Sequence, residues 1–362
     1  MSAPHHDAHR DDSQPQGTTT KVSLARVSLA LAELGYDPLE REDRLVVGLP
    51  GYILTCWMEP HLPSSLHLDG QLRVPLPLAA SSELTRILNA YNGQSPGPVA
   101  SYRVTDAGTL SVRMRAGVFV SDGMTEDQLH SWLRTLLEAS AHLVHELDRL
   151  FPDADLFAPL PEPLRTEQDY AALTGKHPQW RHRAEAPRGP SRAEMDTFPY
   201  TDTALENNAR LRPQWLTEQM LRDAVGGLGF TYGIREDNVL LTQINGMSIS
   251  VESLIGEWVR VYGIWYTDLD SKEHATNLAL LCNEANDRTL VEGCSVFSDA
   301  EHAIVLVSSH LLIDVGVSPA QLFTFIQHAI RYHMDMLDYI STQATGVCCI
   351  DWPQQYPDDP PR

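Results

Sequence analysis

Residues 228–254 read LGFTYGIREDNVLLTQINGMSISVESL, and this stretch decides the fold. A Leu-Gly-aromatic sequence ends a helical pattern, three charged residues follow, and apolar residues then alternate with polar ones on both sides of Asn245-Gly246. Alternation with a period of two predicts strands. Asn-Gly is the strongest short signal for a type I′ hairpin turn, because both of its residues need a positive φ. The stretch therefore predicts a helix that leads into an antiparallel hairpin.

The same order of features occurs earlier in the chain. Leu34-Gly35-Tyr36 matches Leu228-Gly229-Phe230, and Asn89-Ala90-Tyr91-Asn92 recurs as Asn283-Glu284-Ala285-Asn286. A nearly constant offset means that two segments place their elements alike, so we interpret the chain as a tandem duplication.

Proline, charge and apolar periodicity divide the chain further, because proline-rich charged stretches without periodicity are typical of linkers. We predict a disordered tail at 1–20, a first domain at 21–151, a Pro-rich charged linker at 152–212, a second domain at 213–343 and a loose C-terminal tail at 344–362. The two domains are called the first and the second repeat below. Within the linker we expect a short helix near 165–173, and Leu156-Phe157 and Trp180 are apolar enough to dock on a domain.

The second repeat shows its elements most clearly. We predict helices at 215–228 and 271–285, strands at 238–244, 247–254, 258–266, 290–297 and 302–311, and a long closing helix. Ser318 to Gln321 form a capping box that starts this helix, and Thr125 to Gln128 form the same box in the first repeat. Each repeat thus has the order α-β-β-β-α-β-β-α. The predicted class is α+β, with two five-stranded, mainly antiparallel sheets flanked by helices.

This element order, the Leu-Gly-aromatic helix end, the Asn-containing second helix and the capped last helix resemble two kinds of protein. One is the type III secretion chaperones, and the closer one is the bacterial YbjN-domain family of sensory transduction regulators. The resemblance covers most of both repeats and implies a tandem YbjN-domain protein. Related chaperones act as dimers that hold segments of a client, so the resemblance implies that the two repeats imitate such a dimer. The family offers no catalytic residues to transfer to this chain.

Composition excludes several classes of function. The chain has 362 residues, 43% of them apolar, and a formal net charge of -21. The first repeat carries 11 basic and 15 acidic residues, whereas the second carries 6 and 17. This negative field disfavours nucleic acid and anionic membrane surfaces as partners and favours a basic or amphipathic protein. No apolar run is long enough to cross a membrane and the first twenty residues contain no signal sequence, so we expect a cytoplasmic location.

Five cysteines in two large domains do not indicate a disulfide framework. The adjacent pair Cys348-Cys349 lies in the predicted C-terminal tail, and the sequence does not tell its role.

Few residues suggest chemistry. His142 and His145, next to Glu146, have a spacing that can hold a metal ion on a helix, but no third ligand matches them, so we interpret them as a solvated helix face. His328 and His333 lie on different helix faces. A nucleophile motif and a phosphate-binding loop are also absent from the sequence. We therefore predict no catalytic residue, no cofactor and no metal.

Two groups of residues are candidates for protein binding. Trp258, Tyr262 and Tyr266 fall on one face of a predicted strand and Trp265 on the other. Amphipathic rings of this kind are common at interfaces, although core packing explains some of them equally well.

The second candidate group is basic. Arg113 and Arg115 lie on one face of the last hairpin of the first repeat, near Arg103. Either they form a basic patch that meets the acidic second repeat within the molecule, or they keep an exposed sheet face soluble.

We accordingly predict a protein that is not an enzyme and binds a polypeptide client as an internal pseudo-dimer, through an apolar or aromatic sheet face and by edge-strand addition. One alternative is a stress or signalling regulator that acts through protein contacts. Another is a small-molecule or metal-dependent enzyme with its site in the cleft between the repeats. The sequence identifies neither the client nor the pathway.

Overall fold

The structure is a computed structural model. It describes residues 15, 17–60, 63–158, 210–235, 239–254, 256–289, 291–298 and 301–352. Most of the predicted N-terminal tail, the predicted linker helix at 165–173 and Trp180 lie outside the described residues.

The first repeat contains three α-helices and seven strands among its described residues. They are α1 (Leu24–Glu33), β1 (Leu39–Glu40), β2 (Arg44–Leu49), β3 (Tyr52–Glu59), β4 (Ser65–Leu72), β5 (Leu76–Pro77), α2 (Ser81–Gln94), β6 (Val99–Val104), β7 (Thr109–Phe119) and α3 (Glu126–Leu150).

The second repeat follows the same plan. Its described elements are α6 (Glu218–Gly227), β8 (Tyr232–Ile234), β9 (Leu240–Ile244), β10 (Met247–Leu254), β11 (Trp258–Asp270), α7 (Ser271–Asn286), β12 (Glu292–Ser298), β13 (His302–Leu312) and α8 (Pro319–Thr345).

Each repeat folds its strands into one antiparallel sheet. The first sheet has the order β1-β2-β3-β4-β7-β5, with β6 also paired to β7, and the second has the order β12-β13-β11-β10-β9-β8. The five predicted strands of each repeat therefore pair in the same spatial order, β2-β3-β4-β7-β6 and β9-β10-β11-β13-β12. The structure is α+β, with two antiparallel sheets that are each flanked by helices. The sequence did not predict the short strands β1, β5 and β8.

The local signals in the sequence form the predicted turns and caps. Asn245 and Gly246 both have positive φ, 48° and 80°, as a type I′ turn requires. Both capping boxes are present, with Thr125 and Ser318 as the N-cap residues of α3 and α8. Gly35, at the end of α1, has a φ of 90°, a conformation that glycine adopts without strain.

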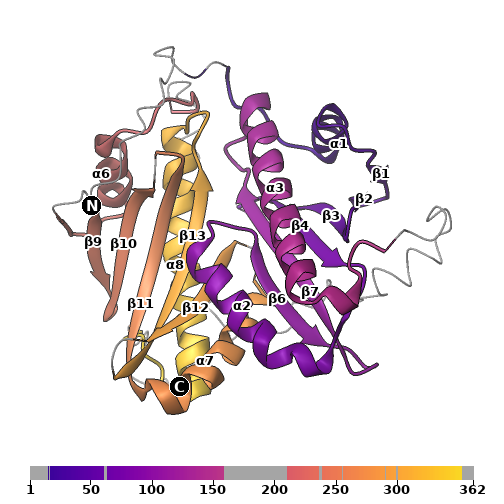
Figure 1. The fold of residues 1–362 in the computed structure, drawn as a ribbon. Helices are drawn as coiled ribbons and strands as arrows, with labels where there is room; N and C mark the ends of the chain where they lie inside the picture. The colour runs from indigo at the N-terminus through magenta and orange to yellow at the C-terminus, as the bar shows by residue number, and fades with distance from the viewer. Residues whose placement is uncertain are drawn as a thin grey trace, which may run out of the picture.

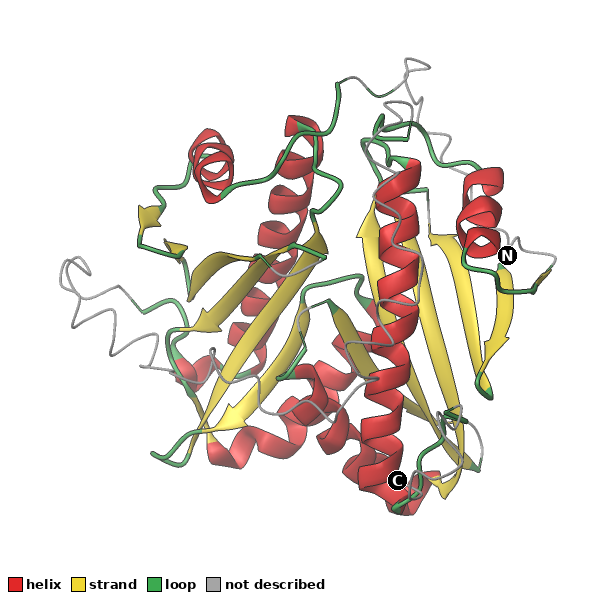
Figure 2. Ribbon diagram, turned by 180° about the vertical axis from the view of Figure 1, so that it is seen from behind, coloured by secondary structure: helices red, strands yellow, loops and turns green. Residues whose placement is uncertain are grey.

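Each core is formed by one sheet together with the three helices of its own repeat. In the first repeat Leu31, Leu66 and Leu133 are fully buried in one apolar cluster, and in the second Val261 and Ile326 belong to another. Figure 1 shows α3 in front of the first sheet and α8 behind the second, and the view from behind in Figure 2 reverses this arrangement. The helix-covered faces of the two sheets therefore point in opposite directions.

Two predicted loose segments are held in place where the structure describes them. Thr20, in the predicted tail, pairs with Met124 in a β-bridge. Near the other end, Ile350 is buried, and the indole of Trp352 donates a hydrogen bond of 2.9 Å to Asp338 on α8. Leu156, one of the predicted docking residues of the linker, is fully buried against the first core. Among the described residues, no helix is long and apolar enough to cross a membrane.

Candidate functional site

The repeated asparagines are hydrogen-bonded to sheet edges. In each repeat the second asparagine of the motif, Asn92 or Asn286, binds an edge strand of its own sheet. The Asn92 amide accepts from Ala100 N–H at 2.8 Å and donates to Ala100 C=O at 2.7 Å. Asn286 makes the same two bonds to Cys294 on β12, at 2.7 and 2.9 Å. These side chains satisfy backbone groups that a sheet edge would otherwise leave unpaired.

The first asparagine of each motif crosses to the other repeat. Asn89 on α2 accepts from Val296 N–H at 2.7 Å and donates to Val296 C=O at 2.9 Å. Asn283 on α7 accepts from Tyr102 N–H at 2.9 Å and donates to Tyr102 C=O at 2.8 Å. A client strand could add to β6 or β12 only by displacing these amides. Edge-strand addition therefore remains a prediction for the outer edges, β1 and β8.

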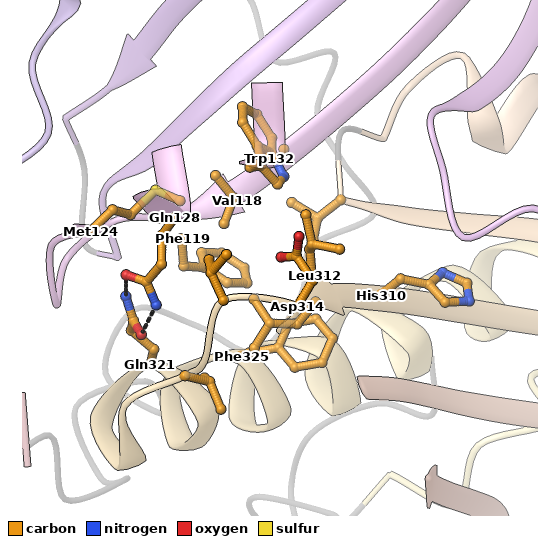
Figure 3. Close-up of a pocket in the computed structure, with 15 residues that line it drawn as sticks. Val118, Phe119, Met124, Gln128, Trp132, His310, Leu312, Asp314, Gln321 and Phe325 are labelled. Atoms are coloured by element: carbon orange, nitrogen blue, oxygen red, sulfur yellow. Dashed lines mark hydrogen bonds between the residues drawn. The ribbon is translucent and has the colours of Figure 1, made fainter. Parts of the chain in front are cut away.

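Two glutamines from the capping boxes meet between the repeats. The Gln128 amide donates to Gln321 Oε1 at 3.0 Å, and the Gln321 amide donates to Gln128 Oε1 at 3.1 Å, as Figure 3 shows. Next to this pair, Ser131 on α3 donates to Asp314, and Thr324 on α8 donates to Asp122 at 2.7 Å. The contacts are reciprocal, because Gln128 and Gln321 exchange roles and Ser131 and Thr324 each donate to an aspartate of the other repeat, as in an isologous interface.

Beside the glutamine pair is a small pocket (Figure 3). Its volume is about 30 Å³, whereas one water molecule needs roughly 10–15 Å³ on this measure. Its polar lining includes Asp314 and His310, and burial lowers the pKa of His310 to about 3, so the imidazole is neutral at physiological pH. The pocket has room for about two or three water molecules, and it is too small for an organic substrate in this arrangement.

The arginine cluster consists of Arg103, Arg113 and Arg115, and it lies between the repeats. Arg103 Nη2 is 2.8 Å from Asp287 Oδ2, and Arg113 Nη1 is 3.7 Å from Asp287 Oδ1. Arg113 also forms a two-bond ion pair with Asp69, and Arg115 donates to the backbone carbonyl of Asp287. Burial lowers the pKa of Arg115 to about 10, and the Asp69 and Asp287 carboxylates oppose that shift. Of the two readings of these arginines, the intramolecular contact is the observed one. Arg113 and Arg115 are 4% and 3% exposed, so they offer no surface to an external client.

The aromatic candidates separate into different environments. Trp258 is half-buried at the inter-repeat boundary and packs edge-on against His310, with ring centroids 6.4 Å apart. Tyr262 is buried under the guanidinium of Arg260, which lies 4.6 Å from its ring centroid. Trp265 packs partly buried against the second core, and Tyr266 is 66% exposed. Of the four, only Tyr266 is largely exposed; whether it binds a protein stays a prediction.

Tyr266 belongs to a larger apolar patch that the sequence analysis missed. Cross-strand pairing places Ile264 opposite Leu306, and Ile304 opposite both Tyr266 and Phe297. These five side chains lie on the face of the second sheet opposite α8, because the alternate residues of β11 and β13 fill the second core. Phe297 is 41% exposed, and the other three are partly exposed. We call these five residues the outer patch. The alternation of β13 was the available signal, but the sequence does not show which face remains uncovered.

The histidines of α3 and the adjacent cysteines near the C-terminus were the remaining candidates for chemistry. His142 and His145 are exposed on α3, and Glu146 pairs with Arg149 at 2.8 Å. The described part of the chain has no group of three His, Cys, Asp or Glu side chains that could hold a metal ion. Burial, together with the nearby Asp338 carboxylate, raises the pKa of Cys348 to about 12, so its thiol is protonated at neutral pH.

Comparisons with known proteins bear on the first repeat. None of the curated proteins compared with the chain matches it. One similar solved structure is that of an Escherichia coli protein, described as "YbjN, a putative transcription regulator", with 14% sequence identity and a TM-score of 0.32. The match covers 36% of this chain and 97% of that one, and such a distant likeness supports no functional conclusion. Residues 23–149, from the N-cap of α1 nearly to the end of α3, match the YbjN family model, described as "Putative bacterial sensory transduction regulator". The first repeat is a YbjN domain.

Proposed function

We propose that the protein is a regulator that acts by binding another polypeptide on the outer patch of its second repeat, and that the two repeats form an internal pseudo-dimer. The observation that carries this proposal is the 66% exposure of Tyr266 within a cross-strand apolar cluster whose other members are partly exposed, Phe297 on the side of its ring that α2 does not contact. Exposed apolar clusters on soluble proteins commonly mark interaction sites. The description of the YbjN family supports the regulatory part of the proposal.

Charge determines which client fits the patch. Exposed carboxylates lie at the end of β11 and in the turn before β13, at Asp268, Asp270 and Glu301. The second repeat as a whole has 6 basic and 17 acidic residues. A segment with apolar side chains on one face and lysines or arginines beside them would bury its apolar groups on the patch and be attracted by the surrounding field. We therefore propose a basic, amphipathic client.

The test combines cross-linking in cells with a defined peptide. A photoreactive phenylalanine analogue replaces Tyr266, and the control places it at Leu29, which is 59% exposed on α1 of the first repeat. We expect a specific cross-linked protein only from position 266. In vitro, a short peptide alternating lysine and valine should bind the intact protein, and Tyr266→Asp should weaken binding at least tenfold. Leu29→Asp should leave it unchanged.

Two results would contradict the proposal. Equal cross-linking from positions 266 and 29 would mean that the patch has no preferred partner. Equal binding of a peptide that alternates glutamate and valine would mean that the acidic surroundings do not select the client.

A further inference from the structure

We infer that the inner surfaces of the two repeats are built to accept only the unlike repeat, so that like repeats do not pair. The inference rests on two equivalent positions at the interface, Asp287 in the second repeat and Gly93 in the first. Each follows directly after the second asparagine of its motif, Asn286 or Asn92. Equivalent positions of a symmetric interface would carry equivalent residues, yet these two differ in charge and size.

At the first contact the second repeat inserts a carboxylate into the arginine cluster. Asp287 pairs with Arg103 and Arg113, and it also accepts a hydrogen bond of 3.3 Å from Ser101 Oγ. The side chains of Arg113 and Asp287 are 5% and 18% exposed, so this pairing is largely removed from water. Asp69 is a further carboxylate at this cluster, and it pairs with Arg113 and Arg115.

At the second contact the first repeat presents no side chain at all. A Cβ atom added to Gly93 would lie 2.8 Å from Phe297 Cζ and 3.1 Å from Ser295 Oγ. The backbone of α2 thus packs directly against the ring of Phe297, and a side chain at position 93 would require that ring to move. The φ angle of Gly93 is not positive, so backbone conformation does not call for glycine here. The close approach of Phe297 and Ser295 is what favours it.

Strand register shows that the two contacts are the same place in the two repeats. Ser101 is opposite Arg113 in the first sheet, and Ser295 is opposite Leu306 in the second. The asparagine bonds to Tyr102 and Val296 put Arg103 and Phe297 at the next equivalent positions. Where the first repeat has arginines, the second repeat therefore has Phe297 and Leu306.

Like pairs would violate both contacts. Two first repeats would place Gly93 against the arginine cluster, which would then lack the carboxylate that Asp287 supplies to Arg103 and Arg113. Two second repeats would place Asp287 against the apolar side chains of Phe297 and Leu306, where its carboxylate would lose its arginine partners. Removing one partner of a largely buried charge pair is unfavourable, and mismatched contacts of this kind are how interfaces reject wrong partners.

The test uses the full chain, cut at a protease site inserted between residues 158 and 210. Fluorescently labelled cut protein is mixed with excess unlabelled cut protein, and the exchange of halves is followed. We expect Asp287→Asn to speed exchange roughly ten- to a hundredfold, because it removes one partner of a buried pair. Asp268→Asn, an exposed acid in the same repeat, is the matched control and should exchange at the wild-type rate. Equal exchange in both variants, including no detectable exchange in either, would overturn the inference.

Two further measurements address pairing itself. Gly93→Asp should speed exchange, and adding Phe297→Arg should slow it again, because the pair rebuilds the contact that Asp287 makes with Arg103. Failure of this rescue would show that packing alone defines the second contact and would refute the charge-based account. After isotope-labelled and unlabelled cut proteins are separated in urea and diluted together, native mass spectrometry should find unlike pairs only. Like pairs at comparable abundance would overturn the inference.

Discussion

Replacing Asn283 by alanine tests whether one side chain joins the repeats through a sheet edge. The substitution removes two hydrogen bonds to Tyr102, of 2.9 and 2.8 Å. Each such bond contributes ~1 kcal/mol net, so their loss costs ~2 kcal/mol. Alanine also favours the helix over asparagine by ~0.5 kcal/mol. We expect the free energy of unfolding to fall by ~1.5 kcal/mol in urea titrations.

The control for helix propensity is on the same helix. Asn277 is exposed on α7, so Asn277→Ala should give the propensity gain of ~0.5 kcal/mol without the loss. The difference between the two variants, ~2 kcal/mol, then measures the two bonds to the edge strand.

Hydrogen exchange locates the effect. Asn283→Ala should speed exchange of the Tyr102 amide by about 30-fold, which corresponds to ~2 kcal/mol. The Val296 amide should keep its rate, because Asn89 still binds it. Asn89→Ala should show the reverse pattern. If either variant changes both amides equally, or neither, the asparagines do not act as separate edge contacts and our account of the interface is wrong.

Three further substitutions test other parts of the structure. Gly93→Ala should lower the free energy of unfolding by ~1–3 kcal/mol in urea, because its Cβ would overlap Phe297, whereas Gly48→Ala, with no atom within 4 Å of the added Cβ, should cost less. Burial raises the pKa of Glu292 to about 7, so the folded state holds this proton more tightly than the unfolded chain does. The free energy of unfolding should therefore fall as pH rises from about 4.5 through 7. Glu292→Gln should flatten that part of the pH–stability curve. Gly246→Ala should lower the thermal midpoint, because φ at this position is 80°.

Local signals in the sequence were sufficient to predict the order of helices and strands along each repeat. The turn at Asn245-Gly246 and the boxes at Thr125 and Ser318 depend on neighbours within a few residues, and the structure confirms all three. The asparagine motifs were visible as repeat marks, but their partners were not. Asn89 and Val296 are 207 residues apart, so no local pattern connects them.

The arginine cluster and the outer patch show a second reason why the sequence alone could not predict the binding surface. Arg113 and Arg115 have the composition of an exposed basic patch, and only the fold shows that Asp69 and Asp287 lie against them and that both are buried. The exposure of Ile304 and Leu306 likewise depends on the register of β11, β13 and β12. It also depends on how much of this face the first repeat covers. Placement of one repeat on the other determines both outcomes.

Duplication within one chain allows the two sheets to differ at equivalent positions. In a dimer of identical subunits, any apolar face needed for a client would occur twice and would double the exposed area that promotes aggregation. A tandem chain can differ at equivalent positions. Gln71 lies opposite Arg113 in the first sheet, where the second sheet pairs Ile264 with Leu306. The first repeat thus uses this face for a charged contact with its neighbour, and the second repeat keeps part of its own face exposed and apolar.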